Sequence, residues 1–309
     1  MAKYVCKRLG YAILTIFLIS VITFTLMNLI PGGPFLSEKA VTPATQAALE
    51  EKYGLNVSKP EQYINYMSGL LQGDLGVSLK QKGRTANDII FSTFPVSARL
   101  GGISILVALV VGVSLGSVAA MCRGKWGDQL IMVVSTLGIA VPSFVVATTL
   151  MKVFGVELKW LPTMGLSTPI HYILPVFTLA FYPMAYITRL MRSSMLDALN
   201  QDYIRTARSK GVKEFLVIMK HALKNAMIPI VTLVGTELGY MLTGSMLIEK
   251  VFAIPGIGKL AVDGMMNRDL PLLQGTVVYI ALVFVIVNLV VDISYAFIDP
   301  RIRYGKGGE

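Results

Sequence analysis

The chain has 309 residues, of which 54% are hydrophobic and 15% are charged, whereas an ordinary soluble domain has about 25% charged residues. This balance excludes a disordered protein, and it argues against a soluble globule because one core cannot bury so much apolar surface. The net charge is +10, and two cysteines and two histidines leave no basis for a disulfide framework and little for a metal site or a histidine-dependent enzyme.

Long apolar runs dominate the chain and predict six transmembrane helices. Each run is long enough to cross about 30 Å of hydrocarbon as a helix. The runs are 9–30, 100–122, 129–151, 169–188, 226–248 and 270–298. The first run is too long for the apolar part of a signal peptide, and no small-residue cleavage site follows it, so we expect it to remain in the protein.

The basic residues predict the orientation of these helices. With both termini in the cytoplasm, the inner segments hold 16 Lys and Arg residues, whereas the two short outer segments hold 5. Basic loops stay on the cytoplasmic side, so this asymmetry places both termini inside. The excess positive charge then lies on the cytoplasmic side, where it is attracted to anionic lipids. It therefore gives no reason to expect a nucleic-acid partner.

The outer segment 31–99 predicts a helical insert on the outer membrane surface. Pro60 opens a helix whose apolar face includes Tyr63 and Met67, and Thr85-Ala86-Asn87-Asp88 resembles a capping box that starts another helix. Two interpretations stay open. The insert is either a packing cap over the helix ends or a docking face for an external binding protein, with Tyr63 and Met67 as contacts.

The segment 189–225 is the longest predicted cytoplasmic loop, and it carries eight basic residues. Gly211 divides it into two helical halves, at about 193–209 and 213–223. A chain that reverses direction often needs a positive φ, which glycine adopts freely. Two short, partly apolar helices exposed at a surface predict a protein-docking element.

This loop resembles the EAA loop of the permeases of ATP-binding-cassette (ABC) importers. Arg205, Thr206 and Ala207 occupy the Glu-Ala-Ala positions of that pattern, and Gly211 occupies its glycine. Two departures are evident. Arg205 replaces the glutamate, and a segment that begins at His221 stands where the family has Ile-x-Leu-Pro.

Further motifs along the chain are similar to the oligopeptide/dipeptide/nickel branch of these permeases, to its OppB-like members more closely than to its DppB-like ones. They are Ile30-Pro-Gly-Gly-Pro-Phe35, Gly73-Asp-Leu-Gly76, Phe94-Pro-Val-Ser97, Val141-Pro-Ser-Phe144, Arg192-Ser-Ser-Met195, Ile248-Glu-Lys-Val-Phe252, Pro255-Gly-Ile-Gly258, Arg268-Asp-Leu-Pro271 and Asp299-Pro-Arg301.

The resemblance implies an all-α polytopic protein with the type I ABC importer permease (MetI-like) fold. It comprises a first helix within 1–30, the insert 31–99 and a five-helix core over 100–309. The implied function is oligopeptide import across the bacterial inner membrane, with Arg205, Thr206, Ala207, Gly211 and His221 meeting an ATPase. This chain would be no enzyme and bind no cofactor, because ATP and Mg belong to two ATPase subunits (OppD/OppF-like). The other implied partners are a second permease (OppC-like) and a peptide-binding protein (OppA-like).

Polar residues inside the predicted helices have two interpretations. A carboxylate at the centre of a membrane helix costs about 2.5–3.5 kcal/mol on insertion scales, so it should face protein or water. Glu237, Asn288 and Asp292 either line a pathway for peptide termini or form hydrogen bonds between helices.

Rival functions remain at this stage. Gly112-Val-Ser-Leu-Gly116 fits a small-residue packing face, but it also fits the nucleophile pattern of a serine hydrolase. The predicted positions of His171 and His221 put both away from Ser114. A passive channel and a permease for dipeptides, nickel or another small solute are the remaining alternatives.

Overall fold

The computed structural model describes residues 2–29, 43–81 and 83–298, with side chains described within 7–29, 47–81 and 83–291. This part of the chain is almost entirely helical. It contains no β-strand, and its one isolated bridge joins Val77 to Thr85. The predicted all-α class is therefore confirmed.

Five helices are long and apolar enough to cross a membrane. They are α1 (Ala2–Leu29), α4 (Ala86–Met121), the helical run that ends in α7 (Ile173–Leu199), the run that ends in α10 (Leu223–Leu242), and α13 (Leu270–Ile298). A sixth span is possible only as a bent pair, α5 (Trp126–Ala140) with α6 (Ser143–Leu150) and the π-helix η1 (Met151–Glu157), whose axes differ by 104°.

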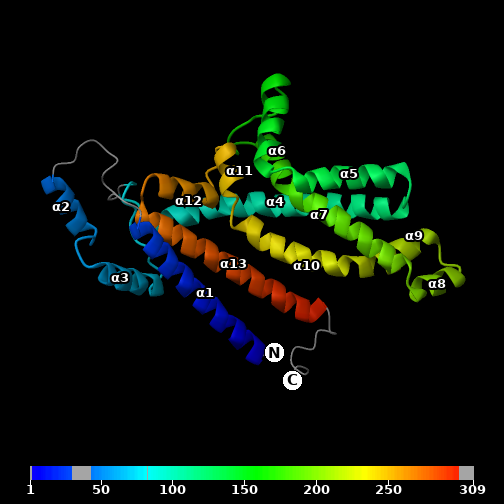
Figure 1. The fold of residues 1–309 in the computed structure, drawn as a ribbon, viewed down its shortest axis with the longest axis horizontal. Coiled ribbons are helices and arrows are strands. Elements are labelled where there is room, and N and C mark those ends of the chain that lie inside the picture. The colour runs from blue at the N-terminus through cyan, green and yellow to red at the C-terminus, as the bar shows by residue number, and fades with distance from the viewer. Residues whose placement is uncertain (1, 30–42, 82, 299–309) are drawn as a thin grey trace.

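The bend corrects the prediction of one straight helix over 129–151. Pro142 has no backbone N–H, so the helical bond to the carbonyl of Gly138 cannot form. Val141 precedes the proline and takes an extended conformation (φ −83°, ψ 123°), as residues before proline usually do. Figure 1 shows α6 standing away from the α5 axis.

The bundle is centred on α4 and α7, which pack along each other and also against α10 and α5 (Figure 1). A Cβ placed on Gly116 would lie 2.5 Å from the carbonyl oxygen of Thr188 on α7. Only a residue without a side chain allows this approach, so the predicted packing face is confirmed. On the other side of the bundle, α13 contacts both α10 and α1.

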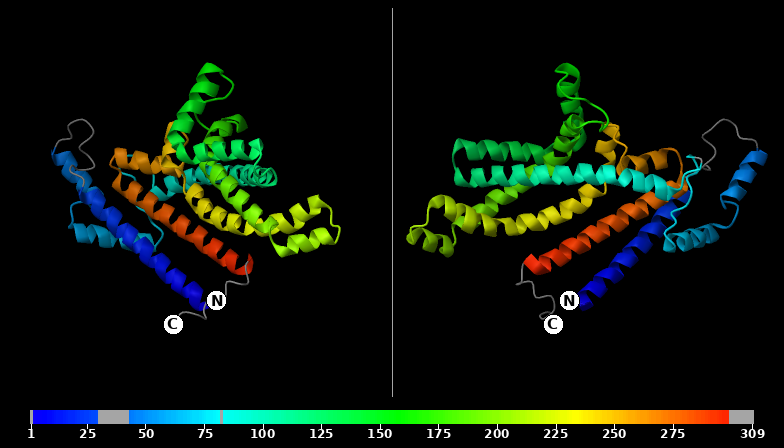
Figure 2. Two further views of the ribbon diagram at one scale, coloured as in Figure 1. Left: turned by 45° about the vertical axis from the view of Figure 1, so that its right-hand side comes forward. Right: turned by 180° about the vertical axis from the view of Figure 1, so that it is seen from behind.

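The insert contains α2 (Pro43–Lys52) and α3 (Lys59–Leu71), followed by an extended loop. Its predicted capping box is confirmed: the Thr85 hydroxyl accepts from the backbone N–H of Asp88, whose carboxylate accepts from the Thr85 backbone N–H. The helix that starts there, α4, continues past residue 99 without a break. In Figure 2, α2 and α3 lie at the opposite end of α4 from α8 (Asp202–Ser209) and α9 (Glu214–Leu216).

A buried carboxyl group joins the helices α4, α11 and α12. Glu249 lies in α11 (Met246–Val251) and is 0% exposed. One of its oxygens accepts the Ser97 hydroxyl of α4 at 2.6 Å, and the other accepts the backbone N–H of Lys259 at 2.9 Å. Lys259 is in the first turn of α12 (Ile257–Met266), so Glu249 caps a helix whose N–H groups have no intrahelical partner.

Two further carboxylates tie distant segments together. Asp269, between α12 and α13, accepts from the Ser78 hydroxyl and from the backbone N–H of Leu79 at 3.0 Å. Asp128 forms a two-bond ion pair with Arg192 of α7, at 2.5 and 2.7 Å. Both carboxylates are buried, so the loops they fix are held by partners far away in the chain.

The environment of Glu249 makes a pH-dependent prediction. Burial raises the pKa of its carboxyl, although hydrogen bonds from Ser97 and the backbone N–H of Lys259 act in the opposite direction. A group with a raised folded-state pKa stabilises the fold fully below its unfolded pKa, and this stabilisation is lost as the pH rises through the folded pKa. Glu249→Gln stays neutral throughout. We therefore expect the unfolding temperature of the wild type to fall relative to Glu249→Gln as the pH rises above about 4, the ordinary pKa of a glutamate.

The measurement is thermal unfolding of both proteins in detergent across this rise in pH. Glu61→Gln is the matched control, because Glu61 is exposed on α3. A difference in unfolding temperature between the wild type and Glu249→Gln that stays constant with pH would contradict the prediction.

Candidate functional site

The predicted docking loop forms a helical projection at one end of the bundle (Figure 2). Its elements are α8, α9 and the π-helix η3 (Val217–Ala222), which continues into α10. The predicted first half, 193–209, is not one helix, because α7 ends at Leu199 and α8 starts at Asp202. The exposed side chains of residues 202–220 are here called the α8–α9 surface.

The helix α8 has two distinct faces. Ile204 and Ala207 are buried in a cluster that includes Met195 of α7 and Val217 of η3. The other face exposes Arg205 and Tyr203. Burial of one face fixes α8 on the bundle, so the opposite face is presented in a defined orientation.

The turn after α8 confirms the prediction for Gly211, whose φ is +74°. Its backbone N–H donates to the Arg208 carbonyl at 2.9 Å. The Arg208 guanidinium then bridges the turn with two bonds to Glu214, at 3.1 and 2.6 Å. This ion pair was not predicted, and its only signal in the sequence is an opposite charge placed across the expected turn.

Large apolar side chains are exposed beside this turn. Phe215 is 70% exposed and Met219 is 47% exposed, and Lys210 and Lys213 lie on the turn between α8 and α9. Such a patch with a polar rim is typical of a protein-interaction surface. The α8–α9 surface is therefore suited to receive another protein.

The structure divides the residues predicted for this contact. Arg205 and Thr206 are exposed, and Gly211 is exposed on the turn. Ala207 is buried in the bundle, and His221 is half-buried in η3, where its carbonyl accepts the side-chain amide of Asn225. Ala207 therefore supports the surface from below, whereas Arg205, Thr206 and Gly211 are available to a partner.

A cavity of about 630 Å³ lies where α7, α10 and the α5–α6 bend meet. Its wall is mostly apolar and aromatic, and Glu237 is the one charged side chain in it. It is lined by Ile139, Ala140, Val141, Pro142, Ser143, Thr178, Leu179, Tyr182, Pro183, Thr236, Glu237, Tyr240, Met241, Ser245, Ile248 and Phe284.

The three predicted pathway residues are placed differently. Glu237 is half-buried in the cavity wall and has no hydrogen-bond or ion-pair partner among the described residues. Asn288 lines a neighbouring hollow of about 300 Å³, and its amide donates to the Phe284 carbonyl of its own helix at 2.9 Å. The backbone of Asp292 belongs to α13, but its side chain lies outside the described residues.

The two side chains predicted to dock a binding protein pack against α1. The Ser20 hydroxyl, which can donate to the Phe17 carbonyl of its own helix at 2.8 Å, lies 2.8 Å from the Tyr63 hydroxyl and 3.6 Å from the Met67 sulfur. This contact lies alongside the second half of α1, not beyond its end. Tyr63 and Met67 thus pack within the chain, and their role in docking a binding protein stays a prediction. On the same helix, Ile64 and Leu71 are exposed.

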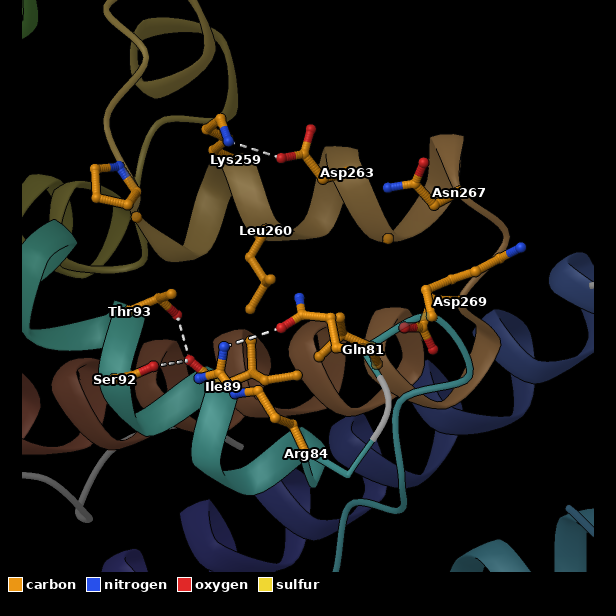
Figure 3. Close-up of a pocket in the computed structure, with 15 residues that line it drawn as sticks. Gln81, Arg84, Ile89, Ser92, Thr93, Lys259, Leu260, Asp263, Asn267 and Asp269 are labelled. Atoms are coloured by element: carbon orange, nitrogen blue, oxygen red, sulfur yellow. Dashed lines mark hydrogen bonds and ion pairs between the residues drawn. The ribbon is translucent and has the colours of Figure 1, made fainter. Parts of the chain in front are cut away.

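A polar pocket of about 270 Å³ lies between the loop before α4 and α12 (Figure 3). Four of its charged and polar side chains form two pairs: Lys259 binds Asp263 at 2.8 Å, and Arg84 donates to Gln81 at 2.9 Å. These side chains therefore need no ligand as a hydrogen-bond partner, and the pocket is a contact region between the two segments.

The possible serine nucleophile is engaged with its own helix. The Ser114 hydroxyl donates to the Val110 carbonyl at 2.7 Å. Gly112 and Gly116 beside it pack against α7. The packing interpretation thus accounts for the whole Gly112–Gly116 pattern.

Comparisons with known proteins agree on one family. Residues 112–304 match the family "Binding-protein-dependent transport system inner membrane component", and residues 1–100 match the corresponding N-terminal family. The chain is 43% identical to the dipeptide transport system permease protein DppB of Bacillus subtilis, over 100% of both chains. It is 42% identical to the oligopeptide transport system permease protein OppB of Haemophilus influenzae, over 98% of this chain and 100% of that one. It is 41% identical to the glutathione transport system permease protein GsiC of Escherichia coli, with the same coverage.

Solved structures show the same fold. An inward-facing methionine ABC transporter, MetNI, matches with a TM-score of 0.58 at 14% identity, covering 68% of this chain and 96% of that one. An amino acid ABC transporter matches with a TM-score of 0.53 at 15% identity, covering 70% of this chain and 95% of that one. The predicted MetI-like fold is therefore confirmed.

The geometry of Gly211 predicts a size-independent loss of stability. A side chain at φ +74° is strained by about 1–2 kcal/mol, but a Cβ there would meet nothing within 4 Å. In the purified chain, Gly211→Ala and Gly211→Leu should therefore lower the unfolding temperature by similar amounts. A clearly larger loss for Gly211→Leu would show a contact inside this chain that the structure lacks.

Proposed function

The chain belongs to the family of binding-protein-dependent transport system inner membrane components, and we propose that it carries oligopeptides as one permease subunit of an ATP-driven importer. Its similar relatives serve transport systems for dipeptides, oligopeptides and glutathione. A peptide importer permease is the common element of these descriptions. Oligopeptides are the finer part of the proposal, and dipeptides, nickel or another small solute are the alternatives.

The observation that carries the proposal is the composition of the 630 Å³ cavity. Pockets of about 300–1,000 Å³ bury drug-sized ligands, so this wall can hold a short peptide segment. The bend at Val141–Pro142 interrupts the helical bonding of the backbone in this wall. Backbone groups released within a membrane are tolerated where they line a water-filled cavity, and there they can bond the backbone of a peptide of any sequence.

Glu237 supplies a charge for one end of such a substrate. It has no hydrogen-bond or ion-pair partner among the described side chains, and the cavity lining contains no Lys, Arg or His that would compete with a substrate for its carboxylate. A protonated peptide amino terminus would form a charge-assisted hydrogen bond with this carboxylate, worth about 1.5–3 kcal/mol. Glu237 would thus orient peptides by their amino end without selecting among their side chains.

The α8–α9 surface supports the second part of the proposal, which is coupling to an ATPase. Arg205, Thr206 and the flanking apolar residues would enter a groove on an ATPase subunit, and α8 would transmit ATPase closure to α7 and α10. ATP and Mg would be bound and ATP hydrolysed by two such subunits (OppD/OppF-like). The other partners would be a second permease (OppC-like) and an extracytoplasmic peptide-binding protein (OppA-like).

The Gly211 variants also test this coupling in the assembled transporter. Glycine at the turn would let an ATPase surface approach closely, so Gly211→Ala should retain part of the peptide-stimulated ATP hydrolysis whereas Gly211→Leu should lose it, because overpacking adds about 1–3 kcal/mol. Normal coupled uptake by Gly211→Leu would remove the turn from the ATPase contact.

The orientation in the membrane is part of the same proposal. With both termini cytoplasmic, a cysteine placed in 59–71 should react with a membrane-impermeant thiol reagent applied outside whole cells, and one placed in 202–216 should react only after lysis. Both measurements need a background without Cys6 and Cys122. Labelling of the second position in intact cells would reverse the assigned orientation.

The substrate proposal predicts a specific defect for Glu237→Gln. In the reconstituted transporter with saturating binding protein, this variant should take up peptides with a free amino terminus about tenfold less efficiently, because one charge-assisted bond is lost. Uptake of the same peptides with an acetylated amino terminus should change little. The matched control is Thr236→Ala, which alters the same wall without removing a charge.

A panel of two-, three- and five-residue peptides in this assay tests the oligopeptide assignment. Transport limited to two residues would replace it by the dipeptide alternative. Equal defects of Glu237→Gln for free and acetylated peptides would exclude the proposed role of Glu237.

A further inference from the structure

A separate cavity of about 340 Å³ lies between the insert and the adjoining ends of α1 and α13. Its polar lining residues come mainly from α2, α3 and α13, and its apolar residues come from α1, the loop before α4 and α13. It is lined by Phe24, Met27, Asn28, Lys52, Tyr53, Gly54, Leu55, Gln62, Asn65, Tyr66, Leu75, Gly76, Val77, Leu79, Leu270, Pro271 and Gln274.

Two residues that line this cavity carry a buried polar atom that has no hydrogen-bond partner among the described residues. These atoms are the Tyr66 hydroxyl and the side-chain nitrogen of Gln274, and Gln274 is only 4% exposed. A buried donor left without a partner costs about 1–3 kcal/mol. The pocket of Figure 3 differs in this respect, because Lys259 and Arg84 in its wall have partners within it.

Both groups are hydrogen-bond donors on residues that line the same cavity. The amide nitrogen of Gln274 carries only donor hydrogens. Burial, with a smaller contribution from Tyr63, raises the pKa of the Tyr66 phenol, so its hydroxyl keeps its proton. The ligand must therefore present oxygen acceptors to these two side chains.

The charge of the lining favours an anion. It includes no carboxylate, and its one charged side chain is Lys52, which is exposed and lies over the Tyr53 ring at 5.7 Å. Lysines at a membrane interface attract anionic headgroups. The combination of two buried donors and one rim cation matches a phosphate group and the ester oxygens next to it.

The remaining wall is apolar and adjoins the lipid-facing surface. Phe24, Met27 and Leu270 line the cavity, while Leu26 and Leu29 are exposed near the same end of α1. A ligand with a polar head and an apolar body fits this division. A free phosphate would leave the apolar wall without a partner.

We propose that this cavity binds the headgroup of an anionic phospholipid, whose phosphate and ester oxygens accept from Gln274 and Tyr66 and whose glycerol and first acyl carbons lie along α1 and α13. Such a lipid would join the insert to two membrane helices. The proposal concerns a region apart from the Glu237 cavity, and it holds whatever solute the transporter carries.

The test measures lipid retention by the delipidated transporter with its partner subunits. Native mass spectrometry and thermal unfolding are recorded with phosphatidylglycerol, phosphatidylcholine, glycerol phosphate and inorganic phosphate. Phosphatidylglycerol should bind most tightly and raise the unfolding temperature most. Equal binding of phosphatidylcholine, or equal stabilisation by either soluble phosphate, would overturn the assignment of an anionic lipid.

Two variants localise the binding. Tyr66→Phe and Gln274→Leu remove two groups that have no hydrogen-bond partner among the described residues, so both variants should fold and should unfold at or above the wild-type temperature without lipid. Each should weaken phosphatidylglycerol binding about tenfold, as expected for one hydrogen bond to a charged group. Lys52→Gln should reduce the preference for phosphatidylglycerol over phosphatidylcholine.

Gln72→Leu is the matched control, since Gln72 follows α3 but does not line the cavity. It should bind phosphatidylglycerol as the wild type does. Wild-type lipid binding by both Tyr66→Phe and Gln274→Leu would overturn the site and leave ordered water as the partner of these two groups.

Discussion

The fold is organised around a carboxyl group that is completely buried where α4, α11 and α12 meet. Glu249 has no ion-pair partner among the described residues, and its two oxygens accept from the Ser97 hydroxyl and from backbone N–H groups at the start of α12. A buried polar group costs free energy unless it forms a hydrogen bond. Glu249 and the N–H groups at the start of α12 satisfy each other, so neither is left buried without a partner. This contact acts together with apolar packing of Ile257 and Leu260 against the first turns of α4 to position α12. Because Ile248 beside Glu249 also lines the central cavity, the same contact helps to set the shape of that cavity.

From the cavity, one helical run leads directly to the α8–α9 surface. Residues 214–242 form α9, η3 and α10 in succession, so Phe215 and Glu237 lie on one continuous rod. At 1.5 Å per residue, the distance between them along the axis is about 33 Å. The Asp128–Arg192 ion pair holds the α4–α5 turn against α7, next to this rod. The exposed surface and the cavity wall are therefore joined by helical segments without an intervening loop, with Pro229 inside α10 between them.

The sequence was informative wherever the chemistry is local. Apolar runs located the spans, the Thr85–Asp88 pattern located the start of α4, and the turn around Gly211 required the conformation that the structure has. The bend at Pro142 was missed because hydropathy is equally high on both sides of it. The roles of Glu249, Asp269 and Arg192 were not predictable, because their partners lie between 64 and 191 positions away in the chain. The contact of Tyr63 with α1 was missed for the same reason, since an amphipathic helix does not indicate which surface receives its apolar face.

The π-helical turn η3 has a consequence for the register of this rod. A π-helix closes its bonds over five residues instead of four, so Val217–Ala222 contains more chain than an α-helix of the same height requires. Each residue of an α-helix turns the chain by about 100° and advances it by 1.5 Å. If η3 tightened into α-helical form, the surplus residue would have to leave the turn, and Phe215 would rotate about the axis while α10 kept its seat in the bundle. Such a change would turn the exposed surface relative to the membrane helix by about 100° for each residue that left the turn.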